Sequence, residues 1–140
     1  MEQPPVLEYE TDRLKHVERY NVIDTLPEQA YDEITQIATL ITNKPVSLIS
    51  FLDESRQCFK SHRGIEQAET PRDYSFCAHA IKTPDQMMII KDAREDKRFF
   101  DNPLVTDNPY VIFYAGVPLV DPDGYPLGTL CVIDHKPGDL

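Results

Sequence analysis

The chain lacks any long apolar run. No apolar stretch in its 140 residues approaches the ~20 residues that a membrane-spanning helix needs. The N-terminal stretch MEQPPVLEYE is acidic and proline-rich, which is not the pattern of a signal peptide. Internal repeats and low-complexity segments are also absent. The length therefore predicts one folded domain, without a membrane span.

Cysteine is scarce, with only Cys58, Cys77 and Cys131 in the chain. An odd number of thiols in apolar or mixed surroundings predicts reduced cysteines in a cytoplasmic protein. No C-x-x-C or H-x-x-x-H spacing occurs, so the sequence predicts neither a metal site nor a cofactor. We also expect no disulfide.

Basic residues are few. The 14 Lys and Arg residues face 24 Asp and Glu residues, which gives a net charge of -10. Such a surface repels phosphate backbones and anionic lipid headgroups. The composition therefore argues against a partner made of nucleic acid and against binding to a membrane surface.

The first part of the chain predicts two helices, a short one over 13–23 and a second one, with a clearer apolar pattern, over 26–42. Thr25 and Glu28 have the spacing of a capping box at the start of the second helix. One apolar stripe of this helix is expected to face the core and consists of Tyr31, Ile34, Ile37, Ala38 and Ile41.

The remainder predicts strands separated by turns, a short helix and a long connection over 93–112. Ser75 is a plausible N-cap for the short helix, over 76–82. Asp123-Gly124 has the composition of a hairpin turn. The expected strands are 46–53, 57–64, 86–92, 113–120 and 127–134. This order predicts an α+β domain with a mostly antiparallel sheet.

Three stretches resemble a GAF domain: VSLISFLDESRQCFKS, ETPRDYSFCAHAI, and DNPLVTDNPYVIFYAGVPLVDPDGYPLGTLCVID. The similarity covers about 13–135 and is to the type found in bacterial histidine kinases and cyclic-di-GMP signalling proteins. It implies a profilin-like fold, with a six-stranded antiparallel sheet that carries helices on one face. It also implies a pocket on the other face, closed by the short helix and the long connection.

The resemblance implies a domain organisation as well. Residues 1–11 would be a flexible tail, 12–135 the GAF-type sensory domain, and 136–140 an exit linker toward a C-terminal output domain. The implied role is regulatory, with binding of an unidentified small-molecule ligand or a partner domain. The output domain would be a histidine kinase or a diguanylate cyclase, and this chain would not itself be an enzyme.

The stretch YSFCAHAI contains Cys77 and His79, two residues apart. Helical residues at this spacing point to different sides, so the pair cannot easily share a metal ion or act as nucleophile and base. Tyr74, Cys77, Ala78 and Ile81 fall on one helical face, which predicts that Cys77 packs in the core. His79 falls on the other side, either in the pocket wall or on the surface.

Specific activities of GAF relatives match less well. Bilin-binding GAF domains attach their chromophore at a cysteine directly followed by histidine, whereas Ala78 intervenes here. Cyclic-nucleotide-binding GAF domains have a pattern of Asn-Lys, Phe and Asp-Glu residues. These residues are present in this sequence, but their spacing differs from that pattern. Free-methionine sulfoxide reductase, a thiol oxidoreductase, uses cysteines near the pocket helix. This chain has no second cysteine in 93–112, where that chemistry would need one.

The predicted pocket is aromatic with a few polar groups, as is usual for small-ligand sites. Alternatively, the aromatic residues fill a collapsed core and Asp92 only caps a turn. The principal candidate ligand-binding residues are Phe76, Cys77, His79, Asp92, Arg98, Phe99, Phe113 and Tyr114. Ala80, Ile90 and Phe100 are further candidates.

Two alternatives to a ligand sensor remain open, the thiol oxidoreductase and a ligand-free dimerisation module. A pocket filled by aromatic side chains would favour the module. We expect a parallel homodimer through helices 13–20 and 26–42, with the N-terminal helix and the chain exit on the same side of the sheet. Gly116 and Gly128 are expected in paired strands, where glycine permits close backbone approach.

Overall fold

A computed structural model describes residues 1–140. The helices are α1 (Glu10–Tyr20), α2 (Gln29–Thr42), α3 (Phe76–Ala80) and α4 (Pro103–Thr106), with short 3-10 turns η1 (Arg72–Tyr74) and η2 (Ala93–Glu95). The strands are β1 (Val46–Leu52), β2 (Arg56–Arg63), β3 (Glu69–Pro71), β4 (Met88–Ile90), β5 (Phe113–Val120) and β6 (Pro126–Asp134).

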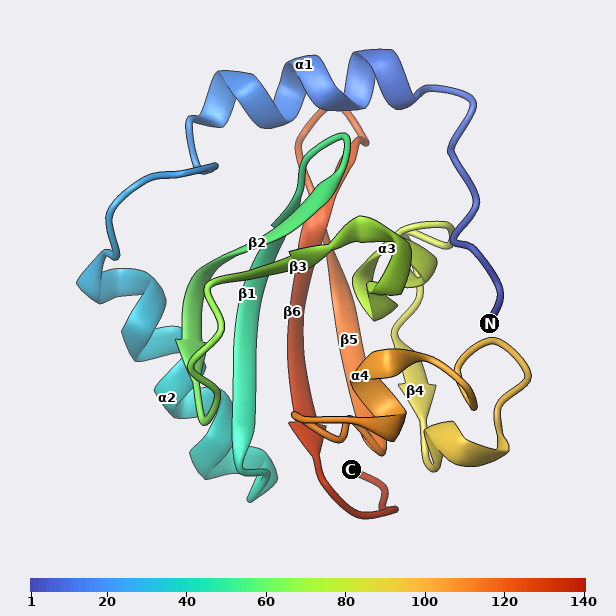
Figure 1. Cartoon of the computed structure of the whole chain (residues 1–140). Helices are drawn as coiled ribbons and strands as arrows, with labels where there is room; N and C mark the ends of the chain where they lie inside the picture. Colours follow the sequence, from blue (N-terminus) through green and yellow to red (C-terminus); the bar gives the residue numbers. More distant parts are fainter.

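The strands form one antiparallel six-stranded sheet in the order β3-β2-β1-β6-β5-β4. Helix α2 covers one face of the sheet, here called the α2 face (Figure 1). Helices α3 and α4 cover the other, here called the pocket face, while α1 crosses the sheet at one end (Figure 1). The predicted α+β class, with its antiparallel GAF-like sheet, is confirmed.

Strand β1 lies in the middle of the sheet between β2 and β6, and all seven of its residues are buried. Both faces of a central strand are covered, which explains why its sequence is mostly apolar and why its two serines are hydrogen-bonded. Leu48 packs in the core of the pocket face, and its neighbour Ile49 packs beneath α1 and α2. This alternation decides which side chains can reach a pocket.

Both predicted strand glycines lie in close contacts. Gly128 pairs with Phe51 and Leu119, and a Cβ atom there would overlap the carbonyl oxygen of Ser50. Gly116 pairs with Cys131, and a Cβ atom there would overlap the ring of Tyr114. Glycine at 116 therefore makes room for an aromatic ring, and the prediction for both positions is confirmed.

Some local predictions need correction. Strand β3 lies outside the five strands expected from the residue pattern, because three residues of an edge strand leave little apolar pattern. Helix α2 begins at Gln29, and its N-cap residue Glu28 makes no side-chain cap bond. Thr25 instead donates to the carbonyl of Val22 and accepts from Lys60 Nζ at 2.6 Å, so the predicted capping box does not form.

The predicted inward stripe of α2 is also wrong in part. Thr35 is the fully buried residue of this helix, with Tyr31 and Ala38 partly buried beside it. The larger apolar side chains point to solvent, with exposed fractions of 44% for Ile34, 53% for Ile37, 73% for Leu40 and 79% for Ile41. We call these four residues the α2 apolar row. The helix turns its small and hydroxylated side to the sheet, where Thr35 bonds Ser61 at 2.9 Å.

Helix α1 and the end of the chain lie far apart along the sheet (Figure 1). Helix α1 crosses the end of the sheet that carries the β1–β2 and β5–β6 turns, and the chain ends at the opposite end (Figure 1). The prediction that both lie on the side of the sheet opposite the pocket concerns its faces: Val17 of α1 packs with Ile49 on the α2 face, and Gly138 of the exit lies near Phe113 of that face. No helix has the length and apolar character needed to cross a membrane.

Candidate functional site

The centre of the pocket face is filled by aromatic rings. Phe76 of α3 stacks on Phe99 with ring centroids 4.0 Å apart and tilts against Tyr114 of β5 at 5.1 Å. All three rings are buried, with exposed fractions of 0–3%. Beside them an inner cavity of only about 30 Å³ remains, which is room for about one water molecule. The implied GAF pocket is therefore closed by its own side chains.

The inner cavity is mostly apolar but has polar groups in its wall. Its lining includes Phe76, Tyr114 and Gln57, together with Thr70. The hydroxyl of Thr70 is buried without a hydrogen-bond partner. An unpaired buried hydroxyl costs free energy that a bound water would recover.

Helix α3 is fixed by local bonds at its start. Ser75 accepts from the amide of Ala78 at 3.0 Å and donates its hydroxyl proton to Gln57, so the predicted N-cap is confirmed. Cys77, Ala78 and Ile81 pack against Leu52. The predicted core face is thus confirmed for these three residues, with Cys77 1% exposed, whereas Tyr74 before the helix is half-buried.

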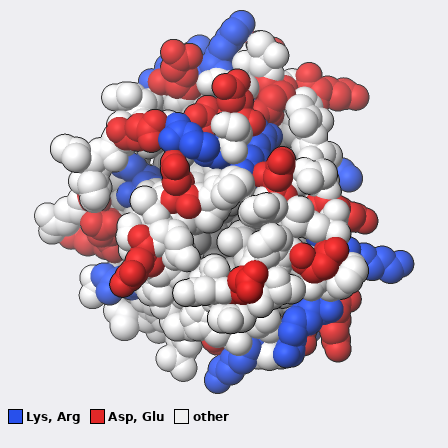
Figure 2. Space-filling view, viewed as in Figure 1, with Lys and Arg blue, Asp and Glu red and all other residues white.

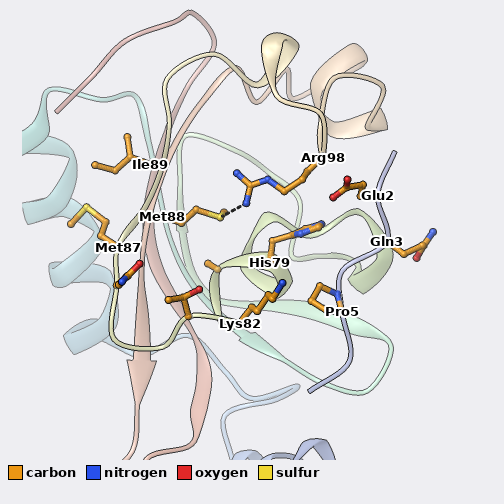
Figure 3. Close-up of a pocket in the computed structure, with 12 residues that line it drawn as sticks. Glu2, Gln3, Pro5, His79, Lys82, Met87, Met88, Ile89 and Arg98 are labelled. Atoms are coloured by element: carbon orange, nitrogen blue, oxygen red, sulfur yellow. Dashed lines mark hydrogen bonds between the residues drawn. The ribbon is translucent and has the colours of Figure 1, made fainter. Parts of the chain in front are cut away.

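A larger hollow lies on the outer side of α3. This outer groove has a volume of about 580 Å³ between the N-terminal segment, α3 and the edge strand β4 (Figure 3). It is lined by Glu2, Gln3, Pro5, His79, Ala80, Lys82, Thr83, Gln86, Met87, Met88, Ile89 and Arg98. Its volume is within the range of small-molecule sites.

Arg98 is held in position by three contacts. Its Nε and one terminal nitrogen donate to the two oxygens of Asp96 at 3.0 and 2.9 Å, and this pairing raises the pKa of Arg98. The other terminal nitrogen lies 3.7 Å from the sulfur of Met88 (Figure 3). The guanidinium lies 5.0 Å from the centre of the Phe99 ring. One face of the groove therefore carries a fixed cation with a nitrogen that bonds only a thioether.

His79 connects the groove to the aromatic stack. The residue is 8% exposed, and its ring meets the edge of Phe99 with centroids 4.9 Å apart. Burial lowers the pKa of His79, although the backbone of Glu2 opposes the shift by hydrogen bonding. Burial therefore favours the neutral imidazole, and the place of His79 in the groove wall matches one of the two predicted alternatives.

The predicted site residues separate into groups. Phe76 and Tyr114 line the inner cavity, His79 and Arg98 line the outer groove, and Phe99 lies between the two. Cys77, although on α3, faces the sheet. Of the further candidates, Ala80 lines the groove, Ile90 belongs to the core and Phe100 is 53% exposed.

Two candidate residues lie outside the site. Phe113 packs with Ala115 and Val132 on the α2 face, because neighbouring strand residues alternate and Tyr114 points the other way. Asp92 caps η2 by accepting from the amide of Arg94, as the alternative interpretation expected. It lines neither the inner cavity nor the groove.

Other groove residues were not found from the sequence. Glu2 belongs to a segment that was expected to be a flexible tail, and Lys82 follows α3 without any motif. The adjacent pair Met87 and Met88 was the best available signal, because methionine is common at adaptable binding surfaces.

The three thiols do not form a reactive site. Cys58, Cys77 and Cys131 are free and buried, and burial raises the pKa of each thiol. Neighbouring Cys77 adds to the rise for Cys131. A thiol with a raised pKa is a poor nucleophile, and no cysteine lines the outer groove.

Two clusters contain groups that can ligate metals, but internal bonds account for both. His16 Nδ1 lies 2.6 Å from Asp121, whose other oxygen accepts from the amides of Asp123 and Tyr125. This cluster attaches α1 to the β5–β6 turn. In the second cluster, which holds Asp24, Cys58 and Glu69, the two carboxylates pair with the guanidinium of Arg56.

A buried ion network joins α1 to the segment that leads into α3. Arg13 is 0% exposed and donates to Glu10 and to the carbonyl of Leu52 at 2.9 Å. Arg72 of η1 donates to Glu10 at 2.5 Å and to the carbonyl of Asp53 at 2.9 Å. Burial tends to raise the pKa of Glu10, but the bonds from Arg13 and Arg72 outweigh it and lower the pKa to about 2.

Charges elsewhere on the pocket face are mixed. Acidic side chains are scattered over it with basic ones between them (Figure 2). This view has no continuous basic surface, in keeping with the net charge of -10.

Comparison with known proteins gives one curated relative of clear similarity. The chain is 40% identical over 137 residues to a cyclic di-GMP phosphodiesterase of Pseudomonas aeruginosa. The match covers 98% of this chain and 23% of that protein, so the chain spans about a quarter of the relative's length.

Solved structures share the fold at low sequence identity. The GAF domain of an Acinetobacter phosphoenolpyruvate-protein phosphotransferase matches with a TM-score of 0.62 at 15% identity, over 95% of this chain and 81% of that one. The type II free methionine-R-sulfoxide reductase of Thermoplasma acidophilum matches with 0.63 at 12%, over 89% and 81%. The family model of the GAF domain matches residues 26–139, and the chain belongs to this family.

Proposed function

We propose that this chain is the regulatory sensory domain of a cytoplasmic cyclic-di-GMP signalling protein, with the outer groove as its ligand site. The observation that carries the proposal is the groove of about 580 Å³ on a domain of the GAF family. GAF domains are commonly regulatory sensors in signalling proteins. The groove, unlike the inner cavity, has room for a small molecule without any rearrangement.

The relative makes a phosphodiesterase the first candidate for an output domain, in place of a histidine kinase or diguanylate cyclase. The aligned part is less than a quarter of that relative, so its catalytic activity need not lie in this part. The buried thiols of our chain also argue against the thiol oxidoreductase alternative. Under this proposal, our chain regulates and does not catalyse.

The proposed route for the signal starts at the groove and ends at α1. His79 belongs to α3, and η1 lies just before α3 in the chain. Arg72 of η1 bonds Glu10, which is shared with Arg13 on α1. A ligand that shifts α3 would disturb these bonds and change how firmly α1 is attached. This is a two-state element biased by differential ligand affinity.

A second candidate function is self-association through the α2 apolar row. The closed inner cavity favours a dimerisation module, as the sequence interpretation anticipated. Four large apolar side chains in a row along one helix are an unusual surface to leave in water. The proposed dimer therefore uses α2, whereas Val17 of α1 is buried within its own domain.

The experiment is purification of the protein, as its native host makes it, followed by native mass spectrometry. We expect the protein to retain a small molecule. We also expect the substitution Arg98→Gln in the same protein to change its rate of cyclic di-GMP hydrolysis. The matched control is Lys97→Gln, an exposed neighbour that does not line the groove. The proposal would be contradicted if the purified protein carried no bound molecule and if Arg98→Gln and Lys97→Gln had the same hydrolytic activity.

A further inference from the structure

The structure assigns a ligand chemistry to the outer groove: we propose that it binds a small organic oxyanion, a carboxylate or phosphate on an apolar group, in competition with the carboxylate of Glu2. The inference rests on the proposed function only in taking the groove as a ligand site. It adds the class of ligand and the role of the N-terminal segment.

The first argument is the set of donors in the groove. Arg98 has one terminal nitrogen that contacts only the Met88 sulfur, a weak acceptor that an oxyanion can replace. Lys82 forms no ion pair within the chain and lies across the groove from Arg98, with His79 between them (Figure 3). Charged donors on two sides suit an oxyanion, because hydrogen bonds to ionised groups are about twice as strong as neutral ones.

The second argument is that the chain already places a carboxylate there. Glu2 lines the groove next to Arg98 (Figure 3), and its charge acts on both Arg98 and His79. Even so, it makes no ion pair with Arg98. An external oxyanion that approaches Arg98 directly would make the contact that Glu2 does not.

The third argument is the weak attachment of the segment that carries Glu2. Residues 1–5 are attached by the amide of Glu2, which donates to the carbonyl of Arg98 at 3.3 Å, and by the amino group of Met1, which lies 2.6 Å from the exposed carboxylate of Asp101. Gln3 and Pro5 complete this wall of the groove. A ligand can displace such a segment at little cost, since an exposed ion pair contributes little stability and one long backbone bond is lost with it.

The opposite wall explains why the ligand should carry an apolar part. Met88 of β4 points into the groove toward Arg98 (Figure 3), and Pro5 and Ala80 add to the apolar lining. Flexible thioether side chains adapt to apolar groups of different shape. An inorganic ion would contact the donors and leave this wall in water, so an organic anion should bind more tightly.

Local charge decides the sign of the interaction despite the net charge of -10. Salt screens surface charges over a distance of about 8 Å at physiological ionic strength, so distant carboxylates have little effect on the groove. Within the groove, Lys82 and Arg98 face the single carboxylate of Glu2, with Asp96 paired behind Arg98. Removal of the Glu2 charge should therefore favour an anion.

The test is an NMR titration of the 140-residue protein with four probes: benzoate, phenyl phosphate, inorganic phosphate and the neutral benzamide. We expect shifts at His79, Lys82 and Met88 with benzoate or phenyl phosphate, and none with benzamide. The two organic anions distinguish a carboxylate site from a phosphate site. Inorganic phosphate should bind at least about threefold more weakly than phenyl phosphate.

Variants then test the residues. Glu2→Gln should tighten binding of the organic anions about threefold or more, and Lys82→Gln and Arg98→Gln should each weaken it about fivefold or more. Lys97→Gln is the matched control and should change nothing. Lys82 is exposed and its variant should fold normally, so it decides the matter if Arg98→Gln does not fold.

Three results would overturn the inference: benzamide binding as well as benzoate, anion binding that Lys82→Gln does not weaken, or unchanged affinity in Glu2→Gln. Its failure is distinct from failure of the proposed function. A neutral molecule retained in the groove of the native protein would end the oxyanion inference alone. Anion binding here without any effect of Arg98→Gln on the native protein's activity would end the proposed function alone.

Discussion

Helices α1 and α2 are both amphipathic in sequence, yet they use their surfaces in opposite ways. Helix α1 buries Arg13 completely and Val17 nearly so, and its His16 bonds the β5–β6 turn. Helix α2 buries Thr35 and leaves its large apolar residues in solvent. The polar helix is thus attached by buried charges, whereas the more apolar one leaves an apolar surface exposed. An apolar stripe alone does not tell whether the partner is the helix's own core.

The sharpest way to break this contrast is Arg13→Ala. The substitution leaves a cavity and removes one partner of the Glu10 carboxylate, and breaking a buried ion pair in this way costs about 3–5 kcal/mol. Denaturant unfolding measures the change. The control is Arg19→Ala, 65% exposed on the same helix, which should alter stability by no more than about 0.5 kcal/mol. Equal effects of the two substitutions would show that the network does not hold α1.

Acid titration tests the same network at Glu10. Its pKa is about 2 in the folded protein against an ordinary 4.5, so the ionised carboxylate stabilises the fold above about pH 4.5. That contribution is lost as the pH falls from 4.5 toward 2. Glu10→Gln lacks it at every pH, so the stability difference between parent and variant should shrink across this range. A difference that stays constant with pH would contradict the role given to Glu10.

His16→Ala should have a smaller effect. The bond from His16 to Asp121 is lost, but Asp121 keeps its two backbone amide donors, so we expect a loss of about 1–2 kcal/mol. Thermal unfolding against Lys15→Ala, an exposed neighbour, gives the comparison. A loss as large as that of Arg13→Ala would mean that the turn, and not the buried network, is the main attachment of α1.

The smallest effect on stability is expected on α2. The double substitution Ile37→Asp, Ile41→Asp changes two side chains that are 53% and 79% exposed, so the free energy of unfolding should change by about 1 kcal/mol or less. Denaturant unfolding at low protein concentration measures it without interference from association. A loss of several kcal/mol would show that these residues pack within the domain, as the sequence pattern first indicated.

The sheet could be predicted from sequence because its signals are local and agree with each other. The double-sided apolar run of β1, the Asp123-Gly124 turn and the Ser75 cap each specify one conformation. The sheet face on which each strand residue lies was predicted less well, as Phe113 shows. Its assignment to the pocket ignored the alternation that gives Tyr114 that face.

The candidate site could be predicted only in part because one wall, with Glu2, Gln3 and Pro5, comes from a segment distant in the sequence. His79, Arg98 and the aromatic stack were named in advance, but Glu2 reaches the groove through tertiary contacts that have no local pattern. Arg13 and Glu10 were missed for a related reason, because a charged residue at a helix surface is ordinarily solvated. Burial of Arg13 depends on the carboxylate of Glu10 and on the carbonyls of Leu52 and Pro126, which lie at the ends of two strands distant in sequence.

Sedimentation velocity tests most directly the claim that α2, and not α1, is the free surface of this domain. The parent and the Ile37→Asp, Ile41→Asp variant are compared over a wide concentration range, with Lys15→Asp on α1 as the control. We expect the parent and the control to associate as concentration rises, while the α2 variant stays monomeric and folded. A parent that remains monomeric at high concentration, or an α2 variant that associates as the parent does, would contradict the account.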